Sequence, residues 1–383
     1  MLKINKTLLR LRKNTARTIG IFGCSLFIFL FCVGAGWAYP SADGAGGKRS
    51  YEVQFFSVKL HGKLDYTRLA NAGISKIIYR VFQDDEQGGG LYFNNSQFRI
   101  LKPSLEELIQ EFDFKRMDLC AWMIGRQFKW ITNTFLFDYE YENGVRRKIP
   151  KLDVFNPDAV ERINMVFKEL ASHKIDCILI QDDFTIRYNE GFSRWGTSKY
   201  RSVTKAVPNE QQMMADGTLY HLNWKRIKVK QLTDLLKEVV RNCKMVNSAI
   251  KVGMNVYYEA PLNIKNSEDW YSHNLWQLAQ TDLDYIYLMS YHRQIKNEMK
   301  LRETANRELF KKIVDKAYEI CKEKLIVKIQ IRDWQTGDRI PESEINAYLK
   351  LVPAGVKRVC FTPVTLDDYG YLERIINSVG SKK

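Results

Sequence analysis

Two adjacent carboxylates, Asp182 and Asp183, end a short apolar run that begins at Cys177. A run of this length is typical of a strand buried on both faces, and α/β barrels keep their chemistry at the C-terminal ends of such strands. An isolated pair would more simply cap the next segment or lie in solvent. Neighbouring strand residues point in opposite directions, so we expect Asp182 to face the barrel axis and Asp183 to support it or bind substrate.

This arrangement would suit cleavage of a glycosidic bond. One carboxyl group must protonate the leaving oxygen, and a second group usually acts as nucleophile or base. We expect Asp182 to be the acid. Glu259, Asp85 and Asp333 are the candidates for the second carboxyl, and the sequence does not rank them.

Aromatic and polar side chains follow the other expected strands as well. Tyr and Trp rings pack against the C–H faces of sugars, which favours a carbohydrate ligand, although any one ring could simply pack on the rim. The expected binding residues at strand ends are Asp85, Glu190, Tyr258, Glu259, Tyr291, Asp333 and Trp334. The histidines are not paired at ligand spacing, so we expect no metal and no cofactor.

Eight strand-like runs alternate with eight segments of helical period. The expected strands are 53–58, 76–82, 119–124, 177–180, 251–257, 285–290, 325–331 and 358–363. The expected helices are 64–72, 104–116, 157–173, 224–246, 268–281, 304–322, 342–351 and 367–377. Ser104 with Glu107 predicts a helix start, and so does Asn156 before Pro157.

This alternation predicts a (β/α)8 TIM-type barrel. A doubly wound open sheet is the alternative, and it would need a glycine-rich turn if it bound a dinucleotide. The cluster Gly88 to Gly90 lacks the G-x-G-x-x-G spacing, so a nucleotide site is not expected.

The N-terminus has the pattern of an export signal. Six basic residues precede an uncharged apolar stretch from Ile19 to Tyr39. We expect residues 1–39 to be a signal peptide or a membrane anchor, residues 40–50 a linker, and residues 51–383 the barrel. The protein would then work outside the cytoplasm, in the periplasm or cell envelope, and touch the membrane only if the segment is not cleaved.

Charge and cysteine content narrow the class further. Removing the six leader positives lowers the formal net charge from +15 to +9, and no nucleic-acid motif accompanies the basic residues, so no nucleic-acid partner is expected. Five cysteines lie beyond the leader, an odd number at wide spacing. We interpret them as buried small hydrophobes rather than a disulfide framework.

Five stretches, in order along the chain, resemble the C-terminal hydrolase domain of the bacterial poly-β-1,6-N-acetylglucosamine N-deacetylases, a family of biofilm exopolysaccharide proteins. They are YRVFQDDEQGGGLYFNN, CAWMIGRQFKW, ILIQDDFTIRYNEGFS, NSEDWYSHNLWQLAQTDLDYIYLMSY and KIQIRDWQ. The resemblance spans Tyr51 to Ser378. It implies that Asp182 is the catalytic acid and that Trp270 and Trp334 line a glycan groove. Tyr188 stands where the family tends to place an acid, so contacts to glucosamine ammonium groups are expected to differ.

The family reaction is endo-hydrolysis of partly de-N-acetylated β-1,6-linked glucosamine polymer. The resemblance therefore implies an exported glycoside hydrolase acting on this amino-sugar polysaccharide. The family's deacetylase domain has no counterpart in the sequence, so a separate deacetylase or export machinery would be a partner. The alternative is a non-catalytic glycan-binding module that guides exopolysaccharide export.

Overall fold

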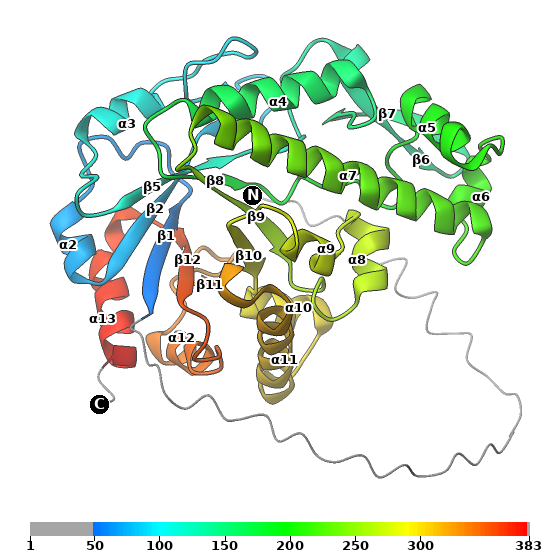
Figure 1. The fold of residues 1–383 in the computed structure, drawn as a ribbon. Coiled ribbons are helices and arrows are strands. Elements are labelled where there is room, and N and C mark those ends of the chain that lie inside the picture. The colour runs from blue at the N-terminus through cyan, green and yellow to red at the C-terminus, as the bar shows by residue number, and fades with distance from the viewer. Residues whose placement is uncertain (1–48, 381–383) are drawn as a thin grey trace, which may run out of the picture. The chain divides into compact units, whose positions relative to one another are not determined.

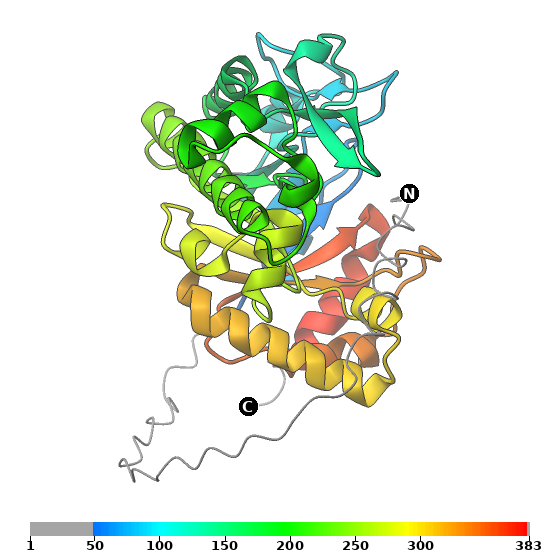
Figure 2. The same cartoon turned by 90° about the vertical axis from the view of Figure 1, so that its right-hand side faces the viewer.

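A closed barrel of eight parallel strands, in the order β1-β12-β11-β10-β9-β8-β5-β2, forms the centre of the computed structural model, which describes residues 49–380 (Figures 1 and 2). Its strands are β1 (Ser50–Phe55), β2 (Ile74–Arg80), β5 (Asp118–Met123), β8 (Cys177–Ile180), β9 (Lys251–Tyr257), β10 (Tyr285–Met289), β11 (Leu325–Gln330) and β12 (Arg358–Val364). Every expected strand overlaps one of them. The (β/α)8 barrel is therefore confirmed.

Helices pack around the outside of this barrel, as Figure 1 shows. They are α2 (Tyr66–Asn71), α3 (Leu105–Glu111), α4 (Pro157–Ala171), α7 (Leu219–Val246), α8 (Ile264–Tyr271), α9 (Leu275–Ala279), α11 (Glu303–Cys321), α12 (Glu342–Leu349) and α13 (Tyr369–Gly380). Both predicted starts are confirmed: the Ser104 side chain accepts from the Glu107 N–H at 3.4 Å, and the Asn156 side chain accepts from the Asp158 N–H at 3.1 Å.

The predicted helix 268–281 is wrong, because the chain forms α8 and α9 with a break between them. Ser272 has a φ of 56°, which ends α8 in the left-handed region. The Asn274 side chain then accepts from the Gln277 N–H at 3.1 Å and starts α9. The Ser272 hydroxyl donates to the Ile186 carbonyl at 2.6 Å, so the break also attaches α8 to the loop after β8.

Several elements that the sequence analysis did not predict lie between the barrel units. They are β3 (Phe82–Gln83), β4 (Gly90–Leu91), η1 (Thr134–Leu136), β6 (Phe137–Glu142), β7 (Val145–Leu152), α5 (Arg194–Thr204), α6 (Glu210–Met214), α10 (His292–Met299), η2 (Lys322–Lys324) and η3 (Leu366–Asp368). The β6-β7 hairpin turns at Asn143 and Gly144, whose φ angles are 53° and 81°. An Asn-Gly pair is a hairpin signal, and it was available in the sequence.

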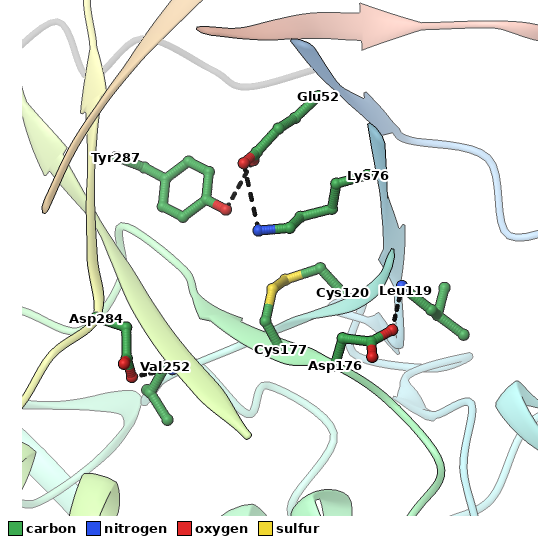
Figure 3. The surroundings of a disulfide bond; sticks show 9 residues. All are labelled: Glu52, Lys76, Leu119, Cys120, Asp176, Cys177, Val252, Asp284 and Tyr287. Atoms are coloured by element: carbon green, nitrogen blue, oxygen red, sulfur yellow. Dashed lines mark hydrogen bonds and ion pairs between the residues drawn. A yellow bond between two sulfur atoms is a disulfide. The ribbon is translucent and has the colours of Figure 1, made fainter. Parts of the chain in front are cut away.

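Polar groups and a disulfide occupy the barrel interior (Figure 3). Cys120 and Cys177 are paired residues of β5 and β8 and form a disulfide with a Cα–Cα distance of 4.4 Å. The expectation that all five cysteines beyond the leader are simple buried hydrophobes is therefore wrong for these two. Cys243, Cys321 and Cys360 are free and buried.

The barrel begins slightly earlier than the sequence predicted. The Arg49 guanidinium donates to the carbonyls of Val352 and Pro353 at 2.6 and 2.9 Å, and Ser50 is the first residue of β1. These two residues of the expected linker thus belong to the barrel. The expected signal or anchor segment lies outside the described residues. Within residues 49–380, no helix has the length and apolar character needed to cross a bilayer.

Candidate active site

Asp182 lies just past the end of β8, at the mouth of the barrel, and is partly exposed. The Tyr257 hydroxyl, from the end of the neighbouring strand β9, lies 3.0 Å from the Asp182 backbone carbonyl and 3.2 Å from the Asp182 carboxylate, and it can donate its one proton to either acceptor. The Tyr257 ring stacks on Tyr271 with centroids 4.0 Å apart. Burial, together with the nearby Asp182 charge, raises the pKa of Tyr257, so the phenol stays protonated and can donate.

Asp183 points away from the mouth and is bound by backbone amides. Its carboxylate accepts hydrogen bonds from the N–H groups of Gly125, Arg126 and Gln127 at 2.7, 2.7 and 2.6 Å. Burial raises the pKa of this carboxyl, while the three donors oppose the rise. With both oxygens engaged, Asp183 fixes the loop after β5 against the end of β8. This position favours a supporting role over direct catalysis.

Glu190 is buried in an ion-pair cluster instead of lining a groove. Its carboxylate lies 3.3 Å from the Arg126 guanidinium, contacts the Lys151 ammonium, and accepts from the Arg187 N–H at 3.1 Å. Despite the opposing effect of burial, the cations Lys151 and Arg126 lower the pKa of Glu190 to about 2. Because the residue is only 3% exposed, its position indicates that it holds the loop after β8 rather than contacting a ligand.

The loop after β8 also carries Arg187, a cation whose pKa responds to the charge of Asp182. Lys228, on α7, donates to the backbone carbonyls of Arg187 and Tyr188 at 2.9 and 3.1 Å and so fixes this turn. Burial lowers the pKa of Arg187, but nearby acidic groups, Asp182 among them, outweigh this effect and raise the pKa overall. The sequence analysis did not select Arg187, since no pattern connects it to Asp182.

An aromatic wall stands on the β1 and β11 side of the mouth. The Trp334 ring, partly exposed, stacks on Phe56 at 5.5 Å and meets Tyr291 edge-on at 5.4 Å. Phe56 in turn contacts Trp122 at 4.9 Å. Burial raises the pKa of Tyr291, with the Asp182 charge as a lesser cause. Tyr291 thus connects this group of rings to Asp182, and the role of the rings in stacking on sugars stays a prediction.

The remaining expected binding residues differ in exposure, since some are partly exposed and others are buried. Trp270, on α8, packs edge-on against Tyr188 at 4.8 Å, and both are partly exposed. Tyr258 is buried, and its hydroxyl donates to Glu298 at 2.7 Å. Glu259 follows directly, past the end of the strand next to β8.

The other two candidate carboxylates have partners on both oxygens. Asp333 accepts from the Arg293 guanidinium at 3.0 Å and from the Gln335 N–H at 2.8 Å. Asp85 accepts from the Gln83 amide at 2.7 Å and from the Gly88 N–H, which stabilises the glycine turn. These partners do not rank the three candidates, and the identity of the second carboxyl stays a prediction; Glu259 differs from the other two in following β9, the strand next to β8.

A histidine and two aspartates lie together near the start of α7 and on α8. Ligand atoms of Asp216, His221 and Asp269 fall within 4.8 Å of one another. The Lys225 ammonium lies 3.3 Å from the Asp269 carboxylate and Lys265 lies 3.8 Å from Asp216, so lysines already neutralise both acids. Sequence spacing could not show this convergence, because it joins α7, α8 and the turn before α7. The expectation of no metal stays a prediction.

Comparisons with known proteins identify the family of the chain and similar folds. Residues 67–362 match the model of the hypothetical glycosyl hydrolase family 13. The fold is similar to the PgaB (BpsB) glycoside hydrolase domain from Bordetella bronchiseptica, with a TM-score of 0.72 and 18% identity over 88% of this chain and 100% of that one. A cold-adapted β-galactosidase from Rahnella sp. R3 aligns with a TM-score of 0.60 and 13% identity over 87% of this chain and 56% of that one. No curated protein matches the sequence. At these identities, the structural likeness shows the fold alone.

Proposed function

The protein belongs to the hypothetical glycosyl hydrolase family 13. We propose that it cleaves internal bonds of partly de-N-acetylated poly-β-1,6-N-acetylglucosamine, with Asp182 as the general acid. The observation that carries this proposal is the environment of Asp182. It is partly exposed at the mouth and oriented by the Tyr257 hydroxyl. The neighbouring acids Asp183 and Glu190 are occupied by backbone amides and buried cations.

In this reaction the Asp182 carboxyl would protonate the glycosidic oxygen as the bond to the anomeric carbon breaks. Glu259, past the adjacent strand, would serve as the second carboxyl. Trp334 and Trp270 would offer ring faces to sugars on two sides of the mouth. The resemblance of the sequence motifs supports the choice of amino-sugar polymer.

We also propose that the protein works outside the cytoplasm. The basic and apolar N-terminal segment supports export. The Cys120–Cys177 disulfide supports it independently, since disulfides persist mainly in oxidising compartments. A separate deacetylase or export machinery would be its partner.

The decisive experiment compares the wild-type protein with Asp182→Asn on this polymer. We expect the wild type to release oligomers and the variant to lose cleavage by at least about 100-fold, as for removal of a general acid, while it binds the polymer unchanged. Release is measured by chromatography and binding by calorimetry. Binding without any cleavage by the wild type would instead support the non-catalytic glycan-binding module.

A further inference from the structure

Trp334 lies in the loop that follows β11, and its own N–H and carbonyl form no hydrogen bond within residues 49–380. Its ring is partly exposed, with Phe56 stacked on it at 5.5 Å and Tyr291 edge-on at 5.4 Å. The position of the ring therefore depends on these two contacts and on how the residues beside it in the chain are held.

Asp333, the residue directly before the tryptophan, is bound through both its main chain and its side chain. Its N–H donates to the Asp338 carbonyl at 2.8 Å, and its carbonyl accepts from the Gly337 N–H at 2.8 Å, which closes a short turn. Its carboxylate accepts from the Gln335 N–H at 2.8 Å and, on the other oxygen, from Arg293 at 3.0 Å. Arg293 therefore links this carboxylate to the rest of the protein.

Arg293, on α10, joins Asp333 to Glu344 on α12. Its Nε and Nη2 atoms donate to the two Glu344 oxygens at 2.8 and 2.7 Å, and its Nη1 atom donates to Asp333. Burial opposes ionisation of Glu344, but its bonds to Arg293 and His292 lower its pKa to about 2, so it is charged at neutral pH. Because all three nitrogens of Arg293 already bind carboxylates, this residue acts through the loop.

The start of α10 is itself firmly held, so the guanidinium has a fixed origin. His292 is 1% exposed, and its Nε2 atom lies 3.1 Å from Glu344. The Asn306 amide on α11 donates to the His292 carbonyl at 3.0 Å. Tyr291, directly before the helix, meets the Trp334 ring. This short stretch thus reaches the tryptophan loop twice, directly through Tyr291 and indirectly through the guanidinium.

We propose that Arg293 is a positioning residue for substrate binding: its bridge between Glu344 and Asp333 holds the tryptophan ring in the orientation that stacks on a sugar unit. This inference rests on the proposed function, in which Trp334 offers that ring face. Since Arg293 contacts the loop and not the glycosidic bond, its removal should affect binding of the glycan and spare the proton transfer from Asp182.

Arg293→Met removes the bridge and keeps a long, unbranched side chain. We expect KM on the partly de-N-acetylated polymer to rise by about 3- to 10-fold, the range for one lost aromatic contact, while kcat stays nearly unchanged. In the Asp182→Asn background, calorimetry should show glucosamine oligomers binding more weakly by a similar factor. Arg293→Lys keeps the charge but loses the planar fork, so it should recover only part of this loss.

Trp334→Ala separates positioning from a general loss of stability. If Arg293 acts through this ring, adding Arg293→Met to Trp334→Ala should weaken binding little further, because the two effects are then not additive. Glu344→Gln tests the bridge from its far end while Arg293 keeps its bond to Asp333. It should weaken binding in the same direction, and again only while the tryptophan is present. Fully additive effects would overturn the positioning role.

Arg68→Met is the matched control. Arg68 also donates to both oxygens of one carboxylate, that of Glu373, at 2.7 and 3.1 Å, but it joins α2 to α13 outside the barrel. Its removal should change neither KM nor oligomer binding.

The outcomes separate this inference from the proposed function. Wild-type cleavage with unchanged KM and oligomer binding in Arg293→Met would overturn the positioning role and leave the proposed function intact. If the wild type cleaves nothing, the proposed function fails, and the isotherms with glucosamine oligomers still decide the role of Arg293. A lower melting temperature of Arg293→Met with unchanged binding, or no oligomer binding by the wild type, would show that Arg293 only stabilises the fold.

Discussion

Asp182 and Asp183 are adjacent and chemically identical, yet their partners assign them different roles. The Asp183 carboxylate accepts from three backbone N–H groups, whereas Asp182 accepts from the Tyr257 hydroxyl at the mouth. The strand pattern predicted that both would follow a buried strand, as they follow β8, and the choice of Asp182 as the acid stays a prediction. It could not predict the amide donors, because they come from the loop after β5, 56 to 58 residues earlier in the chain.

Tyr257→Phe tests whether this hydroxyl orients the acid. We expect kcat to fall by about 10- to 100-fold with KM nearly unchanged, because the variant loses a hydrogen bond to a carboxylate and no stacking surface. Steady-state kinetics on the glucosamine polymer measure the change. Tyr348→Phe is the control, since it removes a tyrosine hydroxyl that donates to Glu303 between outer helices. An unchanged kcat for Tyr257→Phe would contradict the orienting role.

At the scale of elements, the strands were predicted more accurately than their connections. Buried strands are continuous apolar runs, and such runs can be recognised in the sequence without knowing which strands lie beside them. The β6-β7 hairpin was missed because its strands are rich in charged residues and pair outside the barrel, with each other and, through Glu140, with Glu190. The Cys120–Cys177 disulfide was missed because its pairing depends on the register of β5 and β8, which cysteine spacing does not contain.

The cluster around Glu190 joins the loop after β8 to this hairpin region through Lys151. Glu190→Gln should lower the free energy of unfolding at pH 7 by roughly 3 kcal/mol, because Lys151 loses its buried counter-charge and Arg126 keeps only that of Asp138, 2.7 Å away. The pKa of Glu190 is lowered from 4.5 to about 2, so its contribution exists above about pH 4.5 and is lost as the pH falls toward 2. In urea unfolding at pH 7, 4.5 and 3, the difference in free energy of unfolding between the wild type and Glu190→Gln should therefore shrink as the pH falls. A difference that is independent of pH would argue against this.

The disulfide should stabilise the barrel by closing a loop of 57 residues in the unfolded chain. From the loop-closure relation, we expect reduction to cost roughly 4 kcal/mol. Unfolding of the wild type should thus depend on reductant, while the double variant Cys120→Ala/Cys177→Ala should not respond. Cys243→Ala, which removes a free thiol, should respond as the wild type does. Equal stability of the wild type with and without reductant would refute the contribution.

For the whole molecule, the unexpected feature is the polar barrel interior. Glu52 pairs with Lys76 at 3.3 Å and Tyr287 at 2.8 Å, and Lys328 bonds to Asn255 at 3.0 Å. In the sequence, each of these polar residues stands alone within an apolar run. Each could therefore be interpreted as a polar residue at the end of a strand. Their convergence appears only when the barrel closes and non-neighbouring strands face each other.

The buried ammonium of Lys328 should make the stability of the barrel depend on pH. Burial lowers the pKa of Lys328 from 10.5 to about 8, although the nearby acids Asp182 and Glu52 oppose the change. Between pH 8 and about 10.5 the unfolded chain therefore binds more protons at this residue, and the free energy of unfolding should rise with pH. Lys328→Met removes this rise, which amounts to at most about 3 kcal/mol.

The comparison with Lys328→Met isolates one lysine from the others. Lys228 also has its pKa lowered to about 8 by burial, and it contributes equally to both proteins. The free energy of unfolding of the wild type minus that of the variant should therefore increase from pH 8 to 10.5 in urea titrations. A flat difference would mean that the Lys328 ammonium is as well solvated inside the barrel as in the unfolded chain. The interior beneath Asp182 would then hold enough water to act as a polar medium, and the field of Lys328 at the carboxylate would be weak.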